Sequence, residues 1–73
     1  MTIKDTVKKY TNELKQITHI PAKEVEILML HLLEKNTIWL HLNYNNEFLK
    51  EKELANLVKK RATNYPLEYI INK

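Results

Sequence analysis

Apolar residues recur every three or four positions along most of the chain, which is the spacing of one face of an α-helix. The first such stripe opens with Thr2 and, three residues later, Asp5, a pair typical of a helix N-terminus. Its apolar members are Ile3, Val7, Tyr10, Leu14 and Ile17. The stripe is too short to indicate a coiled coil, so we predict an amphipathic helix with one buried face.

A second helix is predicted from Pro21 to Lys35, after a turn at residues 18–20. Proline is favoured at the first helical position because its missing N–H has no partner there. One face carries Val25, Leu28, Met29, Leu32 and Leu33. Ile27 and Leu30 point elsewhere, so apolar side chains nearly encircle this helix, and we expect it to be central and covered on more than one side.

Three shorter segments complete the pattern. We predict that Asn36 ends the second helix and Thr37 caps a third, which contains Ile38, Trp39, Leu40 and Leu42. A turn at residues 43–46 precedes a fourth helix, from about Glu47 or Lys50 to Thr63, with inward-facing Leu54, Leu57, Val58 and Ala62. Pro66 opens a last short helix through Ile70. No segment alternates with period two, so the expected fold class is all-α, a compact bundle of four to five short helices.

Composition bounds this picture. The chain has 73 residues, enough for one small domain, and no cysteine, which excludes disulfides and thiolate metal sites. Glycine is also absent, although helices commonly end on glycine in the left-handed conformation. Asparagine is the usual substitute, and we predict that it takes this role where helices are expected to stop, at Asn36, Asn64 and Asn72.

The net charge of +3 is unevenly distributed, because basic segments at residues 1–23 and 59–73 flank an acidic middle. This pattern fits either solvated helix faces or an anionic partner. The basic run Lys59, Lys60 and Arg61 spreads over most of a helix circumference, so we consider nucleic-acid binding unlikely. The longest apolar run, Ile27–Leu30, is far too short for a membrane span, and no signal peptide is visible; we expect no membrane contact and a cytoplasmic location.

The sequence offers few residues suited to catalysis. There is no serine, cysteine or glycine-rich loop, so we predict no catalytic residue, cofactor site or metal site in this chain. His31 and Glu34 lie one helical turn apart, but nothing completes a metal site, and we interpret His31 as a hydrogen-bonded structural residue. The acidic pairs Glu24/Glu26 and Glu51/Glu53 cannot face each other on a helix. We interpret them as solvated, except Glu26, which we expect in a salt bridge or a helix-end contact.

Two motifs resemble the HemK/PrmC-type methyltransferases. The stretch Glu26–Leu33 is similar to an acidic-apolar-Leu-Leu-x-His-apolar segment in the second helix of their N-terminal domain. The tail resembles their interdomain junction: Lys60-Arg61, two spacers, Asn64, Tyr65, Pro66, then the run Leu67 to Asn72. Asn64 and Asn72 stand where that pattern has glycine, which puts a flexible hinge at Asn72 in doubt.

The resemblance implies a helical docking domain at residues 1–65 and, at residues 66–73, the start of a junction to a catalytic domain. The family transfers a methyl group from S-adenosylmethionine to the glutamine of the Gly-Gly-Gln motif of class I peptide-chain release factors. Its glycine-rich cofactor loop and its Asn-Pro-Pro-Tyr motif are not among these residues. The expected partners are therefore a class I release factor and the protein's own catalytic domain.

Candidate residues follow from this reading. For partner binding we select Lys4, Lys8, Asn43, Tyr44, Asn45 and Asn46. For the interdomain junction we select Arg61, Asn64, Tyr65, Pro66, Leu67, Tyr69 and Ile70. We expect a monomer, and two alternatives stay open: a free-standing helical module that binds protein or nucleic acid, and a homodimer formed through the first-helix stripe and the apolar tail.

Overall fold

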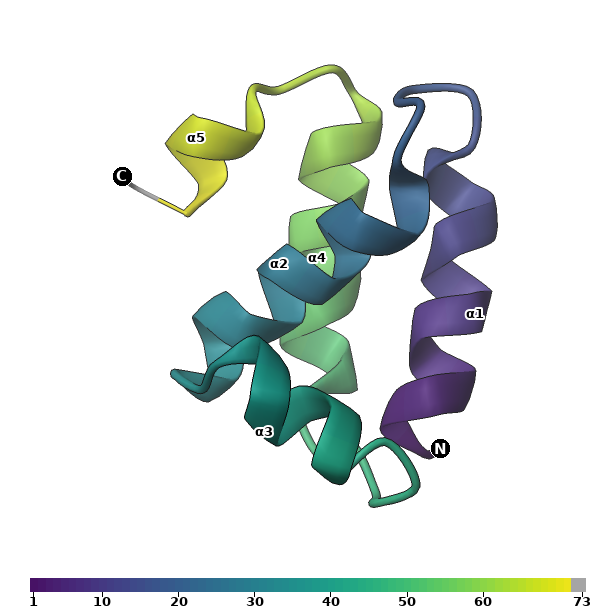
Figure 1. The fold of residues 1–73 in the computed structure, drawn as a ribbon. Helices are drawn as coiled ribbons and strands as arrows, with labels where there is room; N and C mark the ends of the chain where they lie inside the picture. Colours follow the sequence, from purple (N-terminus) through teal and green to yellow (C-terminus); the bar gives the residue numbers. More distant parts are fainter. Residues whose placement is uncertain (72–73) are drawn as a thin grey trace.

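Three helices pack against one another to form the body of the domain in this computed structural model, which describes residues 1–71. These are α1 (Ile3–Leu14), α2 (Pro21–Leu33) and α4 (Glu51–Ala62), each in contact with the other two. Figure 1 shows α2 crossing in front of α4, with α1 beside them. Two short helices, α3 (Thr37–Leu42) and α5 (Leu67–Ile70), complete the fold. The predicted all-α class is confirmed: residues 1–71 hold five helices and no strand, only an isolated bridge between Thr2 and Glu47.

The core sits between α1, α2 and α4, and the predicted apolar stripes supply most of it. All but one of the predicted members of the first stripe are buried, and Ile17, which lies beyond the end of α1, is half-buried. The fully buried side chains include Leu14, Leu28, Met29 and Leu54. The radius of gyration is 11.2 Å, and a folded domain of this length is expected to have about 11 Å. The chain thus closes a core of its own.

Two expectations about helix ends were wrong. The α2 helix ends at Leu33, and Glu34, rather than Asn36, takes the left-handed conformation with φ 56°. Asn36 instead caps α3, because its Oδ1 accepts a hydrogen bond from the Trp39 N–H at 2.8 Å, so Thr37 is the first helical residue and not the cap. Asn64 does adopt the predicted left-handed conformation, with φ 70°. The prediction for Asn72 lies outside the described residues.

The remaining differences concern burial. Phe48, which the periodicity did not select, is 4% exposed and joins the core from the segment before α4. The third helix buries Leu40, whereas Ile38 and Leu42 are 72% and 79% exposed. Because α3 has six residues and makes fewer than two turns, few of its positions face the body, and Trp39 is the other one that packs against the core.

Candidate functional surfaces

The two parts of the predicted partner-binding set lie side by side. The loop at residues 43–46 passes the first turn of α1, and its carbonyl groups accept hydrogen bonds from two α1 N–H groups: Lys4 N to Tyr44 O and Ile3 N to Asn46 O, both 2.9 Å. The next two N–H groups of α1 donate to Thr2, whose hydroxyl caps Asp5 N as the sequence predicted. The N–H groups of Ile3, Lys4 and Asp5, which a helix start leaves without partners in the helix, are thus all satisfied, and the Thr6 N–H begins the regular helical pattern. Lys4 and the loop, forty residues apart in sequence, therefore form one continuous surface.

Within the loop the asparagines divide into supporting and exposed residues. Asn43 is half-buried; its Nδ2 donates to the Trp39 carbonyl at 2.8 Å, and its Oδ1 accepts from Asn46 Nδ2 at 2.6 Å. Asn45 and Asn46 are exposed. Asn43 thus fixes the loop to the end of α3, while the other two amides are accessible to a partner.

Tyr44 points inward and connects the loop to α2. Its hydroxyl donates to Glu26 Oε2 at 3.0 Å, and its ring meets that of His41 edge-on with centroids 5.7 Å apart. His41 Nε2 lies 3.9 Å from the other Glu26 oxygen. Burial, then the hydrogen bond and charge of Glu26, raise the pKa of Tyr44 to about 12. A salt bridge or a helix-end contact was expected for Glu26; its hydrogen-bonded partner is instead the Tyr44 hydroxyl, at 3.0 Å, and His41 lies at the limit of ion-pair distance. Tyr44 thereby holds the loop in place.

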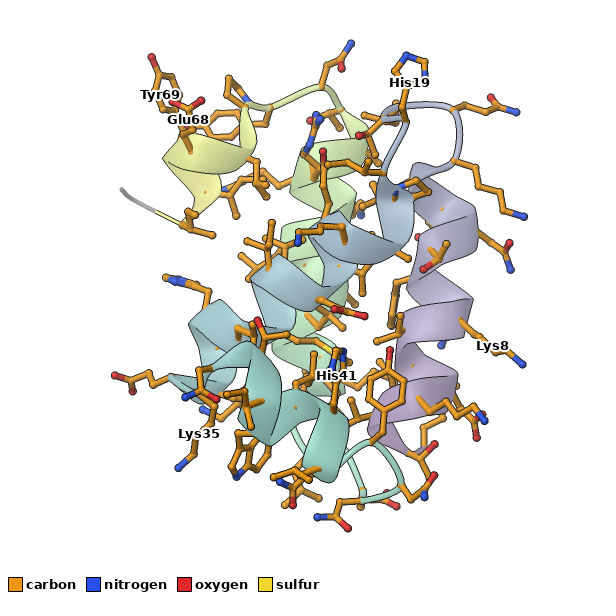
Figure 2. All side chains as sticks on the ribbon, in the orientation of Figure 1. Lys8, His19, Lys35, His41, Glu68 and Tyr69 are labelled. Carbon is orange, nitrogen blue, oxygen red and sulfur yellow. The ribbon has the colours of Figure 1, made fainter. Side chains whose placement is uncertain are left out.

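Lys8 is exposed on α1 and points away from the body (Figure 2). Its neighbour Lys9 behaves differently, because its Nζ lies 2.8 Å from Glu51 Oε2, an atom that also accepts the Tyr10 hydroxyl at 3.1 Å. The hydrogen bond between Lys9 and Glu51 is the first cause of a raised pKa at Lys9 and a lowered pKa at Glu51. The prediction that Glu51 is solvated was therefore wrong: it joins the start of α4 to α1.

Arg61, selected for the interdomain junction, faces the body of the domain. Its Nε lies 2.8 Å from Glu24 Oε1 and its Nη2 lies 3.4 Å from the second oxygen. The two side chains are only 14% and 8% exposed, so the interpretation of Glu24 as solvated was also wrong. The sequence did contain a signal that each residue lies on an inward helix face: Glu24 precedes buried Leu28 by four residues, and Arg61 follows Leu57 by four. It did not indicate that the two residues pair. The pair joins α2 to α4 within the domain.

The other junction residues form a separate region around α5. Leu67 and Ile70 are half-buried and pack against the core, as does Ile71, whereas Tyr65 and Tyr69 are 42% and 68% exposed. The two tyrosine rings meet edge-on with centroids 6.0 Å apart, and Lys60 Nζ lies 5.5 Å from the Tyr65 ring centre. Pro66 precedes the helix with no side-chain capping bond. Figure 2 shows Tyr69 directed away from the body.

A hollow of about 510 Å³ lies between α2 and the end of α5, with an apolar floor and a polar rim. The floor comprises Ile27, Leu30 and Ile71, and the rim His31, Glu34 and Lys35. His31 is exposed there, which does not fit the structural role expected for it. Across residues 1–71 no group of three or more His, Asp or Glu side chains is arranged to hold a metal ion.

The family comparison covers nearly all of the described residues. The family model described as the PrmC N-terminal domain matches residues 5–71, which include the loop, Lys8 and Lys9 of α1 and the α5 region, whereas Lys4 lies one residue before the match. The chain belongs to the PrmC N-terminal domain family. That family is part of the release-factor glutamine methyltransferases, so the recognition made from the two sequence motifs is confirmed.

Further comparisons add no second relative to the PrmC match. Searches of curated proteins and of solved structures give no match to this chain. Within the described 71 residues, no helix is long and apolar enough to cross a bilayer.

Proposed function

We propose that this chain is the substrate-docking domain of an S-adenosylmethionine-dependent methyltransferase that modifies the glutamine of the Gly-Gly-Gln motif of class I release factors. The observation that carries the proposal is the PrmC N-terminal family match over residues 5–71. The surfaces support a binding role, since the α1 start and the 43–46 loop are held rigidly together by backbone hydrogen bonds. The proposed location is the cytoplasm, where release factors act.

Docking would work by positioning. A rigid body that holds the release factor in one orientation lowers the entropic cost of bringing its glutamine to a distant catalytic pocket. Lys4, Lys8, Asn45 and Asn46 are the exposed contact residues of this proposal. Asn43 and Tyr44 serve it indirectly, because their internal hydrogen bonds fix the shape of the loop.

The proposed domain division places the docking domain at residues 1–65 and the start of the junction at residues 66–73. The left-handed turn at Asn64 separates α4 from α5 and redirects the chain. Leu67 and Ile70 then attach the junction to the body, while Tyr65 and Tyr69 present an aromatic surface. The catalytic domain is the proposed partner of that surface.

The cofactor belongs to the catalytic domain and not to these residues. S-adenosylmethionine sites of this family use a glycine-rich turn between a strand and a helix, which needs a backbone that approaches the ligand closely. This chain has no glycine, and the first N–H groups of its longest polar helix start, on α1, are already bonded to Thr2 and to the loop. The residues therefore do not fit the cofactor, and methyl transfer requires a second domain.

The methyltransferase part of the proposal is tested by the coding sequence that follows Lys73. We expect roughly 200 further codons that encode a glycine-rich loop after a strand and an Asn-Pro-Pro-Tyr motif. A stop codon directly after Lys73 would contradict the assignment to an enzyme and leave a free-standing helical binding module.

The docking part is tested by calorimetric titration of the chain with an unmethylated class I release factor. We expect saturable binding with one site, weakened by Asn45→Ala in the exposed loop. Asn56→Ala is the matched control, because Asn56 is an exposed asparagine on α4, outside the proposed surface. Absence of binding, or equal weakening by both variants, would contradict docking through the loop.

A further inference from the structure

The carboxylates and the lysines of this domain are used differently. Four carboxylates contact groups of the chain itself: Glu24 with Arg61, Glu26 with Tyr44, Glu47 with the N-terminal amine, and Glu51 with Lys9. Among residues 1–71, Lys9 is the one lysine in an ion pair. The other lysines are therefore not neutralised by an ion pair within the described residues, whereas these four carboxylates are engaged inside the domain.

Three of the free lysines form a row on α1. Lys4, Lys8 and Lys15 are four and seven residues apart, close to one and two helical turns, so they share one face over about 16 Å. All three are exposed, and Lys15, the C-cap of α1, keeps helical backbone angles. Glu13 lies away from this face, one turn beyond Lys9, whereas Asp5 borders it, three residues before Lys8. We call Lys4, Lys8 and Lys15 the lysine row.

A distinct structural feature lies at each end of the lysine row. At the Lys4 end lies the 43–46 loop with its exposed amides. At the Lys15 end, the turn between α1 and α2 borders a solvent-open recess of about 170 Å³ lined by Lys15, Gln16, Ile17, Thr18 and His19. A cation and an imidazole beside a recess of this size suit a single carboxylate side chain.

We propose that the lysine row and the recess at its end receive an acidic surface of the release factor, with one Asp or Glu side chain in the recess. This inference rests on the docking function proposed above and specifies its chemistry. A protein partner is favoured over single-stranded nucleic acid because aromatic side chains for base stacking do not accompany the lysine row. Tyr69 of α5, whose ring meets that of Tyr65, lies on the other side of the body from Lys8 in Figure 2.

A charged row of this kind acts mainly on encounter. Complementary potentials raise association rates by roughly 10- to 1,000-fold at low ionic strength, and salt screens the effect. Binding to the release factor is therefore expected to weaken steeply between 50 and 300 mM salt, chiefly through a slower association rate.

The test measures association of the 73-residue chain with an immobilised, unmethylated class I release factor at those two salt concentrations. The triple variant Lys4→Glu, Lys8→Glu, Lys15→Glu is expected to associate about 10-fold or more slowly at low salt and to lose most of the salt dependence. The triple variant with glutamine at the same positions is expected to lie between it and the wild type. The matched control, Lys50→Glu, Lys52→Glu, Lys59→Glu, changes the net charge equally on exposed positions around α4.

The outcomes separate this inference from the function on which it rests. A wild-type chain that binds without salt dependence, or two glutamate variants that weaken equally, would overturn the lysine row while leaving docking intact. A wild-type chain that binds no release factor would overturn docking itself. Tighter binding of the chain to single-stranded RNA than to the release factor, abolished by the same three changes, would show that the row binds nucleic acid. Thermal unfolding of each variant verifies that the fold is kept.

Discussion

The start and the end of the chain differ in how they are attached to the body. Helix α1 buries five residues and has its first N–H groups bonded to Thr2 and to the 43–46 loop. Helix α5 is four residues long, has no fully buried residue and starts without a side-chain capping bond. Its outward face carries the exposed tyrosine pair, whereas the outward face of α1 carries lysines.

This difference indicates two kinds of surface. The outward face of α1 is polar and needs no cover in water, so we expect any partner to bind it reversibly. The α5 region exposes aromatic rings over a half-buried aliphatic base, which is typical of a surface that another part of the protein covers. The comparison predicts that the first region dominates the stability of the isolated chain and that the second depends on its neighbour.

The largest expected effect contrasts the two regions through matched truncations. Leu14→Ala on α1 removes a side chain that is 0% exposed and should lower the free energy of unfolding by about 3 kcal/mol. Ile70→Ala on α5 removes a half-buried side chain and should cost about 1 kcal/mol. Urea unfolding of the isolated chain measures both, and equal losses would show that α5 belongs to the core.

The next effect tests whether Arg61 belongs to the body or to the junction. Arg61→Ala leaves the Glu24 carboxylate without its partner at a site 8% exposed and should cost about 2–3 kcal/mol. The neighbouring Lys60→Ala removes an exposed cation near the Tyr65 ring and should cost at most about 0.5 kcal/mol. Thermal unfolding compares the two variants. If Arg61→Ala left the melting temperature unchanged, the pair with Glu24 would not stabilise the body, and Arg61 would be a junction residue only.

Sequence periodicity was sufficient to predict the helices and most of the core. It failed where a single contact decides the outcome. The left-handed residue could not be located, because Glu34 adopts a conformation that its side chain does not favour and Asn36 is used as a cap instead. Phe48 was missed because it lies outside any helix and reaches the core from a loop.

The candidate residues were less predictable than the fold. Lys4 and the 43–46 loop were selected together as candidate partner contacts, and the structure shows them adjacent. Which side chains of this set face inward depends on long-range pairs. Tyr44 and Arg61 both contact carboxylates from α2, more than fifteen residues away in sequence. No local pattern specifies such a pairing, because it depends on how the helices cross.

A smaller effect tests how firmly the loop is attached beside α1. The pKa of Tyr44 is raised to about 12 in the folded chain, from an ordinary value of 10, so the tyrosine contributes stability that is complete below pH 10 and is lost as the pH rises through about 12. Melting temperatures between pH 9 and 12 should therefore fall more steeply in the wild type than in Tyr44→Phe. Parallel curves would show that the hydroxyl does not hold the loop to Glu26.

The smallest effect concerns the left-handed residues. Glu34→Gly should raise the free energy of unfolding by roughly 0.5–1 kcal/mol, because glycine adopts φ 56° without a steric penalty. Asn64→Gly, at the turn that leads to α5, should change it less, since asparagine already tolerates this conformation. A loss of stability in Glu34→Gly would indicate that the Glu34 side chain makes a contact that outweighs the backbone strain.

The central claim is that the release factor binds the α1 start and the loop, while the α5 region is kept for the catalytic domain. Amide resonances of the isotopically labelled chain, followed during titration with an unmethylated class I release factor, test it most directly. The account predicts that Lys4, Lys8, Asn45 and Asn46 shift or broaden and that Tyr65 and Tyr69 do not. Changes centred on Tyr65 and Tyr69, with the α1 start and the loop unaffected, would contradict it.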